Sequence, residues 1–310
     1  MNDRARPPAT GTVYETGGGV YVVALDSGDL VEASLRGRLK REARTGGRVV
    51  IGDRVDLSRS GEAWTIEEVE PRRSELVRRG RGARVAKILA ANLDRVFVVV
   101  ALREPRASSQ LIDRLLVLVE SSGMHPLLVL NKVDLDGARD AAEKLVAKYE
   151  AIGYDVVVAS AVTGEGIEAV GELLCAGTSA LIGPSGAGKS SLLNAIEPDL
   201  ELRTGGLSKK TGTGRHTTVG SRLIPLACGG RVADTPGFGD VALWSMPPDE
   251  ISSCFPELVP LSAQCRFRGC THLHEPECAV RQALEEGRIE RSRYDSYVVL
   301  REEAVAAAPH

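Results

Sequence analysis

The sequence predicts a multidomain protein with three parts: a small N-terminal β-barrel, a central α/β domain on a mainly parallel sheet, and a C-terminal α-helical region. Three observations predict this. Short apolar runs separated by turn residues fill residues 11–70. From about residue 93, buried strands alternate with helical patterns. Near the C-terminus, three cysteines fall within 14 residues.

Composition excludes several classes of protein. The chain has 310 residues, of which 43% are hydrophobic and 26% charged, as in ordinary soluble proteins rather than disordered chains, collagens or membrane bundles. The longest apolar run, residues 96–102, is far shorter than the roughly 20 residues that span a bilayer. The first ten residues hold no hydrophobic segment, so we expect no secretory signal, no membrane partner and a cytoplasmic location.

The N-terminal part is basic and the remainder is acidic. Residues 1–87 hold 17 Lys and Arg against 13 Asp and Glu, and the rest holds 22 against 29. One basic stretch alone is most simply a solvated loop, but two that flank one β-module favour a nucleic-acid surface. The two stretches comprise Arg36, Arg38, Lys40, Arg41, Arg44 and Arg48, and then Arg72, Arg73, Arg78, Arg79, Arg81, Arg84 and Lys87.

We expect residues 1–10 to be a disordered tail and residues 11–87 to form an OB-like β-barrel with a basic linker. The predicted strands are residues 20–25, 31–35, 49–57 and 63–69. Strands this short and this close together suggest a small barrel, which is a common oligonucleotide-binding scaffold.

The central domain is expected over residues 88–245. Its predicted strands are residues 96–101, 126–130, 156–159, 180–182 and 231–233, and its predicted helices are residues 108–123, 138–153, 167–175 and 191–196. This alternation indicates a parallel sheet covered by helices.

The sharpest motif is GPSGAGKS at residues 183–190, which matches G-x-x-x-x-G-K-[ST] in full and lies between a strand and a helix. Its glycines let backbone N–H groups wrap around phosphates, its lysine supplies a cation, and its final serine supplies a hydroxyl for Mg²⁺. The predicted phosphate-binding residues are Gly183, Pro184, Ser185, Gly186, Ala187, Gly188, Lys189, Ser190 and Ser191.

A second motif, Asn131-Lys132-Val133-Asp134, follows a predicted strand and suits guanine. The Asp134 carboxylate can accept two hydrogen bonds that adenine cannot donate, which discriminates strongly between the bases. Asn131 can bond the opposite edge and the Lys132 stem can cover the ring. A backbone N–H at Ser160-Ala161 could reach the guanine 6-oxo group. A simple turn cap is the alternative for the four-residue motif.

Two further segments have the character of nucleotide switches. Asp234-Thr235-Pro236-Gly237 follows a predicted strand, so Asp234 can orient Mg²⁺ through water and the Gly237 N–H can contact a γ-phosphate. The Gly- and Thr-rich residues 209–218 precede it, and Thr217 or Thr218 would contact the metal. A plain surface loop is the alternative for the latter segment.

The order of these motifs is unusual. In a conventional GTPase the phosphate loop precedes N-K-x-D, but here N-K-V-D lies at residue 131, the phosphate loop at 183 and D-T-P-G at 234. This order indicates a circularly permuted GTPase domain.

Cys265-x4-Cys270-x-His272-x5-Cys278 offers three thiolates and an imidazole, a complete tetrahedral set for one structural zinc ion. His274 is a competing ligand. Because the chain shows no secretory signal, the clustering favours a metal over disulfides, and we expect Cys175, Cys228 and Cys254 to be small core residues. The helical zinc domain is expected over residues 246–310.

These residues resemble one family, the ribosome small subunit-dependent GTPase A proteins of bacterial 30S maturation. The resemblance rests on the basic barrel, N-K-V-D, GPSGAGKS, G-R-H-T-T at residue 214, D-T-P-G and the Cys/His cluster. It implies a cofactor set of GTP or GDP, Mg²⁺ and zinc, with Cys265, Cys270, His272 and Cys278 as zinc ligands. It also implies slow intrinsic hydrolysis that the small (30S) ribosomal subunit stimulates, binding to the rRNA of that subunit, and a role late in its assembly. A monomer is our default.

Phe238 stands where many GTPases carry the glutamine that positions water, so hydrolysis by the isolated protein should be slow. His216 is the candidate that orients the water, with a purely loop-shaping role as the alternative; His216→Ala with unchanged stimulated kcat would exclude it. Since about 28 residues separate Gly237 from Cys265, we hypothesise that GTP reorients the zinc module against the barrel. Equal label distances in the GTP-analogue and GDP states would refute this.

Three other functions stay open at this point. A small-metabolite phosphotransferase would not need Asp134 or the switch segments, and competition between GTP and ATP would identify it. A passive RNA-binding protein would not need an intact Lys189, Ser190 and Asp234. A GTP-binding, RNA-associated regulator that the ribosome does not activate would bind GTP yet show no stimulation.

Overall fold

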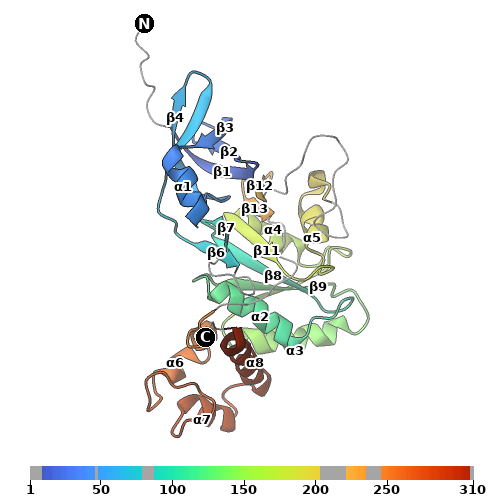
Figure 1. The fold of residues 1–310 in the computed structure, drawn as a ribbon. Helices are drawn as coiled ribbons and strands as arrows, with labels where there is room; N and C mark the ends of the chain where they lie inside the picture. Colours follow the sequence, from blue (N-terminus) through green and yellow to red (C-terminus); the bar gives the residue numbers. More distant parts are fainter. Residues whose placement is uncertain (1–8, 46–47, 79–86, 203–220, 235–245, 308–310) are drawn as a thin grey trace.

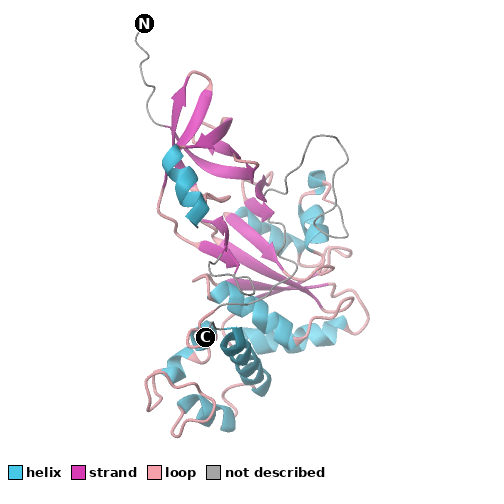
Figure 2. Cartoon of the chain, viewed as in Figure 1, coloured by secondary structure: helices cyan, strands magenta, loops and turns pink. Residues whose placement is uncertain are grey.

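The computed structural model describes residues 9–45, 48–78, 87–202, 221–234 and 246–307. The barrel, the central α/β domain and the C-terminal helices follow one another along the molecule (Figure 1). Strands make up the barrel and the central sheet, whereas the C-terminal part contains only helices and loops (Figure 2). The predicted fold class is therefore confirmed.

The N-terminal part is a closed five-stranded barrel with the strand order β1-β2-β3-β5-β4, closed by pairing of β1 with β4. Apolar side chains that alternate along the strands fill it, among them the buried Val13, Val23, Val55 and Ile66. Its elements are β1 (Ala9–Gly17), β2 (Val20–Leu25), β3 (Leu30–Leu35), α1 (Gly37–Thr45), β4 (Arg54–Ser60) and β5 (Ala63–Val69).

Three local expectations for the barrel are wrong. The first strand begins at Ala9, inside the expected tail. The third predicted strand begins at Arg54 rather than at residue 49. The first basic stretch contains helix α1 rather than a loop. Residues 9–10 and helix α1 gain their structure from packing on the barrel, whereas the apolar residues 49–51 lie outside β4, and local composition records neither outcome.

A short two-stranded sheet, β6 (Glu75–Arg78) and β7 (Lys87–Ala91), joins the barrel to the central domain. The joint contains a buried ion pair. The fully buried Asp53 carboxylate accepts from Arg72 Nε at 2.7 Å and Nη2 at 3.0 Å, and from the Val50 N–H at 2.8 Å. Part of the second basic stretch therefore serves structure rather than a ligand.

The central sheet has the order β10-β9-β8-β11-β13-β12, with β12 antiparallel to β13. Every predicted strand of this domain is present; β12, a short and partly polar strand between β13 and β1, was not predicted. The elements are β8 (Arg95–Ala101), α2 (Ser109–Glu120), β9 (Pro126–Asn131), α3 (Ala138–Glu150), β10 (Asp155–Ala159), α4 (Ile167–Cys175), β11 (Thr178–Ile182), α5 (Lys189–Ile196), η1 (Pro198–Leu200), β12 (Ser221–Pro225) and β13 (Arg231–Asp234).

Helices cover both faces of this sheet because its strands are apolar on both sides. On β8, Val96 and Val98 pack in the core shared with α2, α3 and the C-terminal helices. Their neighbours Phe97 and Val99 pack in the opposite core, with α4 and α5. At the far edge, β12 pairs with β1 of the barrel, with Glu15 opposite Arg222, so the barrel and the central sheet are continuous.

The C-terminal part consists of η2 (Ile251–Cys254), α6 (Val259–Ser262), α7 (Ala279–Glu285) and α8 (Arg291–Ala307). Helix α8 docks on α2 and α3 (Figure 1). At the centre of this junction the buried Arg293 donates to Asp113 of α2 at 2.7 Å and to Glu257 at 2.7 and 3.1 Å. A buried ion pair therefore joins the C-terminal part to the central domain.

Two predicted core cysteines are instead joined to each other. Cys175, at the end of α4, and Cys228, in the turn between β12 and β13, form a disulfide. The sequence suggested none because the two lie 53 residues apart and outside the cysteine cluster. The fold brings them together, since a Cβ on Gly230 would lie 2.2 Å from the Leu174 carbonyl oxygen. Cys254 is buried, as expected.

In the described part of the chain, every helix is too short or too polar to cross a lipid bilayer.

Candidate nucleotide site and metal centre

The predicted nucleotide-binding motifs meet at one edge of the sheet, beyond the carboxyl ends of its parallel strands. The phosphate loop follows β11, N-K-V-D begins at the last residue of β9, Ser160 follows β10, and Asp234 ends β13. Ligands of open α/β sheets bind at this edge.

Glycine is required at two positions of the phosphate loop. Gly183 has φ +145°, and a Cβ there would lie 2.0 Å from the Val99 carbonyl oxygen. Gly188 has φ +93° in the left-handed region, and a Cβ there would lie 2.2 Å from Asn131 Nδ2. Both glycines let the loop approach its neighbouring strands closely, as a loop that wraps phosphates requires.

Lys189 is held within the loop that it serves. Its Nζ donates to the carbonyl oxygens of Gly183 at 2.6 Å and of Pro184 at 3.0 Å. Burial lowers the pKa of Lys189 to about 8. The side chain is only 9% exposed, so its ammonium is a desolvated cation whose attraction for an anion is screened little by water. Ser190 and Ser191 lie beside it in the first turn of α5.

Asn131 ties the base motif to the phosphate loop. Its Nδ2 donates to the Ala187 carbonyl at 2.8 Å, and its buried Oδ1 has no hydrogen-bond partner within the described residues. The amide therefore acts first as a brace between two motifs that are 56 residues apart. Lys132, with φ +63°, donates to the carbonyl of Glu104, so the loop after β8 also belongs to this site.

Asp134 is exposed, and Ser160 orients it. The buried Ser160 hydroxyl donates to Asp134 Oδ1 at 2.6 Å and accepts from the N–H groups of Val162 and Thr163, each at 3.2 Å. The Ser160 N–H already donates to the Glu165 carbonyl at 2.9 Å. Between Ser160 and Ala161, the candidates for the guanine 6-oxo group, Ala161 is therefore the one whose N–H is not bonded to the Glu165 carbonyl. Sequence reasoning missed the hydroxyl's role, because a serine after a strand carries little signal.

Asp234 lies at the end of β13, where its carboxylate accepts from Arg222 Nε at 3.3 Å. The two residues are directly opposite on neighbouring strands. The remaining residues of the predicted switches, His216, Thr217, Thr218 and Gly237, lie outside the described residues, as does Phe238.

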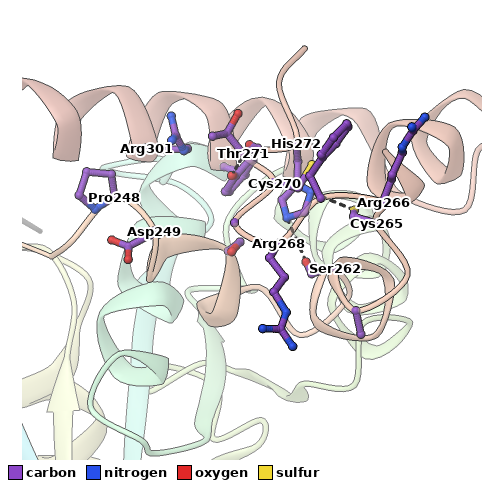
Figure 3. A pocket seen from close by; sticks show the side chains of 15 residues that line it. Pro248, Asp249, Ser262, Cys265, Arg266, Arg268, Cys270, Thr271, His272 and Arg301 are labelled. Carbon is purple, nitrogen blue, oxygen red and sulfur yellow. Dashed lines mark hydrogen bonds between the residues drawn. The ribbon is translucent and has the colours of Figure 1, made fainter. Parts of the chain in front are cut away.

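The predicted metal ligands converge in the C-terminal part. Figure 3 shows Cys265, Cys270 and His272 close together. One ligand atom from each of Cys265, Cys270, His272 and Cys278 lies within 4.8 Å of the others. His272 Nδ1 is 3.6 Å from Cys265 Sγ and 3.5 Å from Cys278 Sγ, and those two sulfurs are 3.9 Å apart.

These distances suit zinc. Tetrahedral bonds of about 2.3 Å to sulfur and about 2.0 Å to nitrogen place two sulfurs about 3.8 Å apart and a sulfur about 3.5 Å from a nitrogen. Burial lowers the pKa of His272, which favours the neutral imidazole that can bind a metal. The alternative ligand His274 is exposed and does not belong to the group.

Neighbouring polar groups fix the shape of the metal centre. Ser262 Oγ lies 3.0 Å from His272 Nε2, which leaves Nδ1 directed at the thiols (Figure 3). Tyr294 donates to the carbonyl of His272 at 2.7 Å. Partial burial opposes charge on Glu275, yet hydrogen bonds from Thr271 and His274 outweigh it and lower the pKa of Glu275 to about 2. An ionised carboxylate thus holds the ligand loop together.

Comparison with known proteins identifies the family. The model of the RsgA GTPase family matches residues 69–244, more than half of the chain. The chain belongs to the RsgA GTPase family. It is therefore a GTPase, and its N-K-V-D motif preceding the phosphate loop is the circularly permuted order.

Relatives match along nearly the whole chain. A protein of Gemmatimonas aurantiaca named small ribosomal subunit biogenesis GTPase RsgA is 46% identical, over 95% of this chain and 97% of its own length. A protein of the same name from Moorella thermoacetica is 41% identical, over 96% of this chain and 97% of its own length.

Two solved structures share the fold. The crystal structure of YjeQ from Thermotoga maritima has a TM-score of 0.79 and 33% identity, covering 96% of this chain and 99% of its own. That of YloQ, described as a circularly permuted GTPase, has a TM-score of 0.75 and 29% identity, covering 100% and 99%.

Proposed function

We propose that this GTPase acts late in the assembly of the small (30S) ribosomal subunit, binds its rRNA, and hydrolyses GTP slowly until the subunit stimulates it. One observation carries the guanine-nucleotide part. The Asn131 amide joins N-K-V-D to the loop at residues 183–190, which supports a single site for the guanine base and the phosphates. The names of the relatives and the basic N-terminal part support the ribosomal part.

Different residues of the site bind the guanine base and the phosphates. Asp134, oriented by Ser160, accepts from the guanine N1–H and 2-amino groups, and Ala161 offers its N–H to the 6-oxo oxygen. Lys132 covers the ring. Residues 183–188 wrap the phosphates with backbone N–H groups, and Lys189 exchanges its carbonyl partners for the β- and γ-phosphates.

Ser190 and Asp234 fit a magnesium ion, because a hydroxyl and a carboxylate are the hard oxygen donors that it takes. Thr217 or Thr218 would complete this set. Bound Mg²⁺ neutralises charge that develops on the phosphate oxygens. Asp234 would orient the ion through water, and in this structure its Oδ2 accepts from Arg222. The Cys₃His group fits one structural zinc ion, with four protein ligands and no open position.

For hydrolysis we assign His216 to orient the attacking water, and the Gly237 N–H to contact the γ-phosphate. Phe238 cannot hydrogen-bond water, so the free protein is slow. We assign residues 9–87 to the barrel and basic linker, 88–245 to the GTPase domain and 246–310 to the zinc domain. We further propose a cytoplasmic monomer.

The test is GTP hydrolysis by the purified protein, with purified small subunits, with large subunits, and alone, at matched salt. We expect stimulation by small subunits only, loss of hydrolysis in Lys189→Ala, and displacement of bound GTP by GDP but not by ATP. Intact GTP binding with no stimulation would remove the ribosome as activator and leave a GTP-binding regulator.

A further inference from the structure

A basic groove on the central domain has no assigned role. It lies between the loop after β8, the start of α2 and the first turns of α3, with a volume of about 620 Å³. Three cationic side chains line it, Arg103, Arg106 and Lys144, against a single carboxylate, Asp140. The hydroxyls of Ser108 and Ser109 lie at its rim.

The cations of this groove lack protein partners. Across the described part of the chain, none of the three forms an ion pair or hydrogen bond, and Arg103 Nε is buried without a partner. A guanidinium N–H that is removed from water and left unpaired carries a free-energy cost. Arg103 Nη2 lies 2.8 Å from the position that a Cβ on Gly137, the N-cap of α3, would take, so the guanidinium lies close against the start of that helix.

We propose that this groove binds the phosphodiester backbone of small-subunit rRNA. The excess of cations selects an anion, and Arg groups suit phosphate geometry. Arg106, Asp140 and Lys144 are exposed, so the groove is open to solvent and accommodates a continuous chain better than a small enclosed ligand. This inference rests on the proposed function, because it names a further contact with the same partner.

The groove lies next to the nucleotide site, and one loop belongs to both. Arg103, Arg106 and Ala107 line one side of the groove. Glu104 and Pro105, in the same loop, reach the nucleotide site. Lys132 donates to the Glu104 carbonyl, and a Cβ on Gly186 of the phosphate loop would lie 3.1 Å from Pro105 Cδ. RNA bound at Arg103 and Arg106 would therefore act on a segment that touches both the base motif and the phosphate loop.

The experiment measures binding of purified small subunits to the full-length protein as a function of salt concentration. The variant is Arg106→Gln/Lys144→Gln. Its control is Arg139→Gln/Arg291→Gln, which removes the same charge from exposed residues outside the groove. Each lost phosphate contact lowers the slope of log K against log salt by about 0.7 to 0.9. We expect the variant's slope to fall by about 1.5 and its affinity at low salt to drop on the order of tenfold, with unchanged GTP binding by the free protein.

A photo-crosslinking residue at Ser109 identifies the occupant. Nuclease-sensitive crosslinks to rRNA are expected, whereas crosslinks to ribosomal protein alone would overturn the RNA assignment. Equal slopes for the variant, the control and the wild type would overturn the groove as a contact while leaving the proposed function intact. Failure of the wild type itself to bind small subunits would refute the proposed function.

Discussion

Replacing Arg293 by methionine should weaken the joint between the GTPase domain and the C-terminal part more than any surface change. The guanidinium is 1% exposed and makes three hydrogen bonds to carboxylates, one to Asp113 and two to Glu257. It also lies 4.6 Å above the Phe255 ring. Methionine keeps much of the packing volume and removes the charge, so the variant isolates the electrostatic contribution.

The size of the stability loss follows from the hydrogen-bond donors that the two carboxylates would retain without Arg293. Asp113 is fully buried and would keep only two neutral donors, Tyr149 at 2.7 Å and Ser296 at 2.6 Å. Glu257 is partly exposed and can regain water. Removing one partner of a buried pair typically costs about 3 to 5 kcal/mol. For a chain of this size the melting temperature should fall on the order of 10 °C.

The assay is thermal and urea unfolding by circular dichroism, with two comparison variants. Arg291→Met alters an exposed arginine two residues earlier, paired with Asp295, and should cost less than about 0.5 kcal/mol. Arg293→Met/Asp113→Asn should be more stable than Arg293→Met alone, because it removes the stranded charge. A loss below about 1 kcal/mol for Arg293→Met, or fully additive losses in the double variant, would refute the reasoning.

Three further results are expected. The GTP affinity of the free protein should fall about fourfold between pH 7 and pH 8.5, because Lys189, with its pKa of about 8, loses its proton over this range. The Lys189→Arg variant should show no such fall, since arginine stays protonated. Fluorescence titrations with a labelled nucleotide measure both affinities. Chelation, or Cys270→Ser, should lower the melting temperature and release zinc, with GTP binding within about twofold, whereas His274→Ala should retain the metal. Reductant should lower the free energy of unfolding of the wild type by up to about 4 kcal/mol, because the Cys175–Cys228 disulfide closes a loop of 53 residues. The Cys175→Ala/Cys228→Ala variant should be unaffected by reductant.

Local patterns predicted the parts of the fold that local chemistry specifies. The strand at residues 178–182 and the glycine-rich loop after it could be predicted, because one apolar run followed by one glycine-rich motif is enough to identify them. The Cys₃His group is legible because its ligands lie within 14 residues. Strand β12 was missed because it is short and partly polar, and its stability comes from pairing with β13 and with the distant β1.

Contacts between distant residues could not be predicted in the same way. Arg293 is 180 residues from Asp113, and an arginine on a polar helix is normally a solvated residue. The Ser160 hydroxyl and the Glu104 carbonyl belong to the nucleotide site because the fold brings the ends of neighbouring strands together. The local sequence around each residue does not show this. For Arg293 and Lys132 the sequence shows one partner of the interaction and gives no sign of the other, and for Asp134 and Ser160 it gives both residues without the hydrogen bond between them.

The arrangement of the three parts bears on how a switch could be transmitted. The short chain distance from D-T-P-G suggested the zinc module as the part that responds to GTP, yet its helix α8 is joined through Arg293 to Asp113 on α2, which follows β8 rather than a switch strand. The barrel instead pairs through β1 with β12, whose Arg222 is the partner of Asp234. The Asp234 carboxylate accepts from Arg222 through Oδ2, and Glu15 of the barrel is the residue opposite Arg222 on the other side. A change at Asp234 therefore lies one residue pair away from the strand pairing that joins the barrel to the sheet, whereas the zinc module is joined to α2 by a buried ion pair.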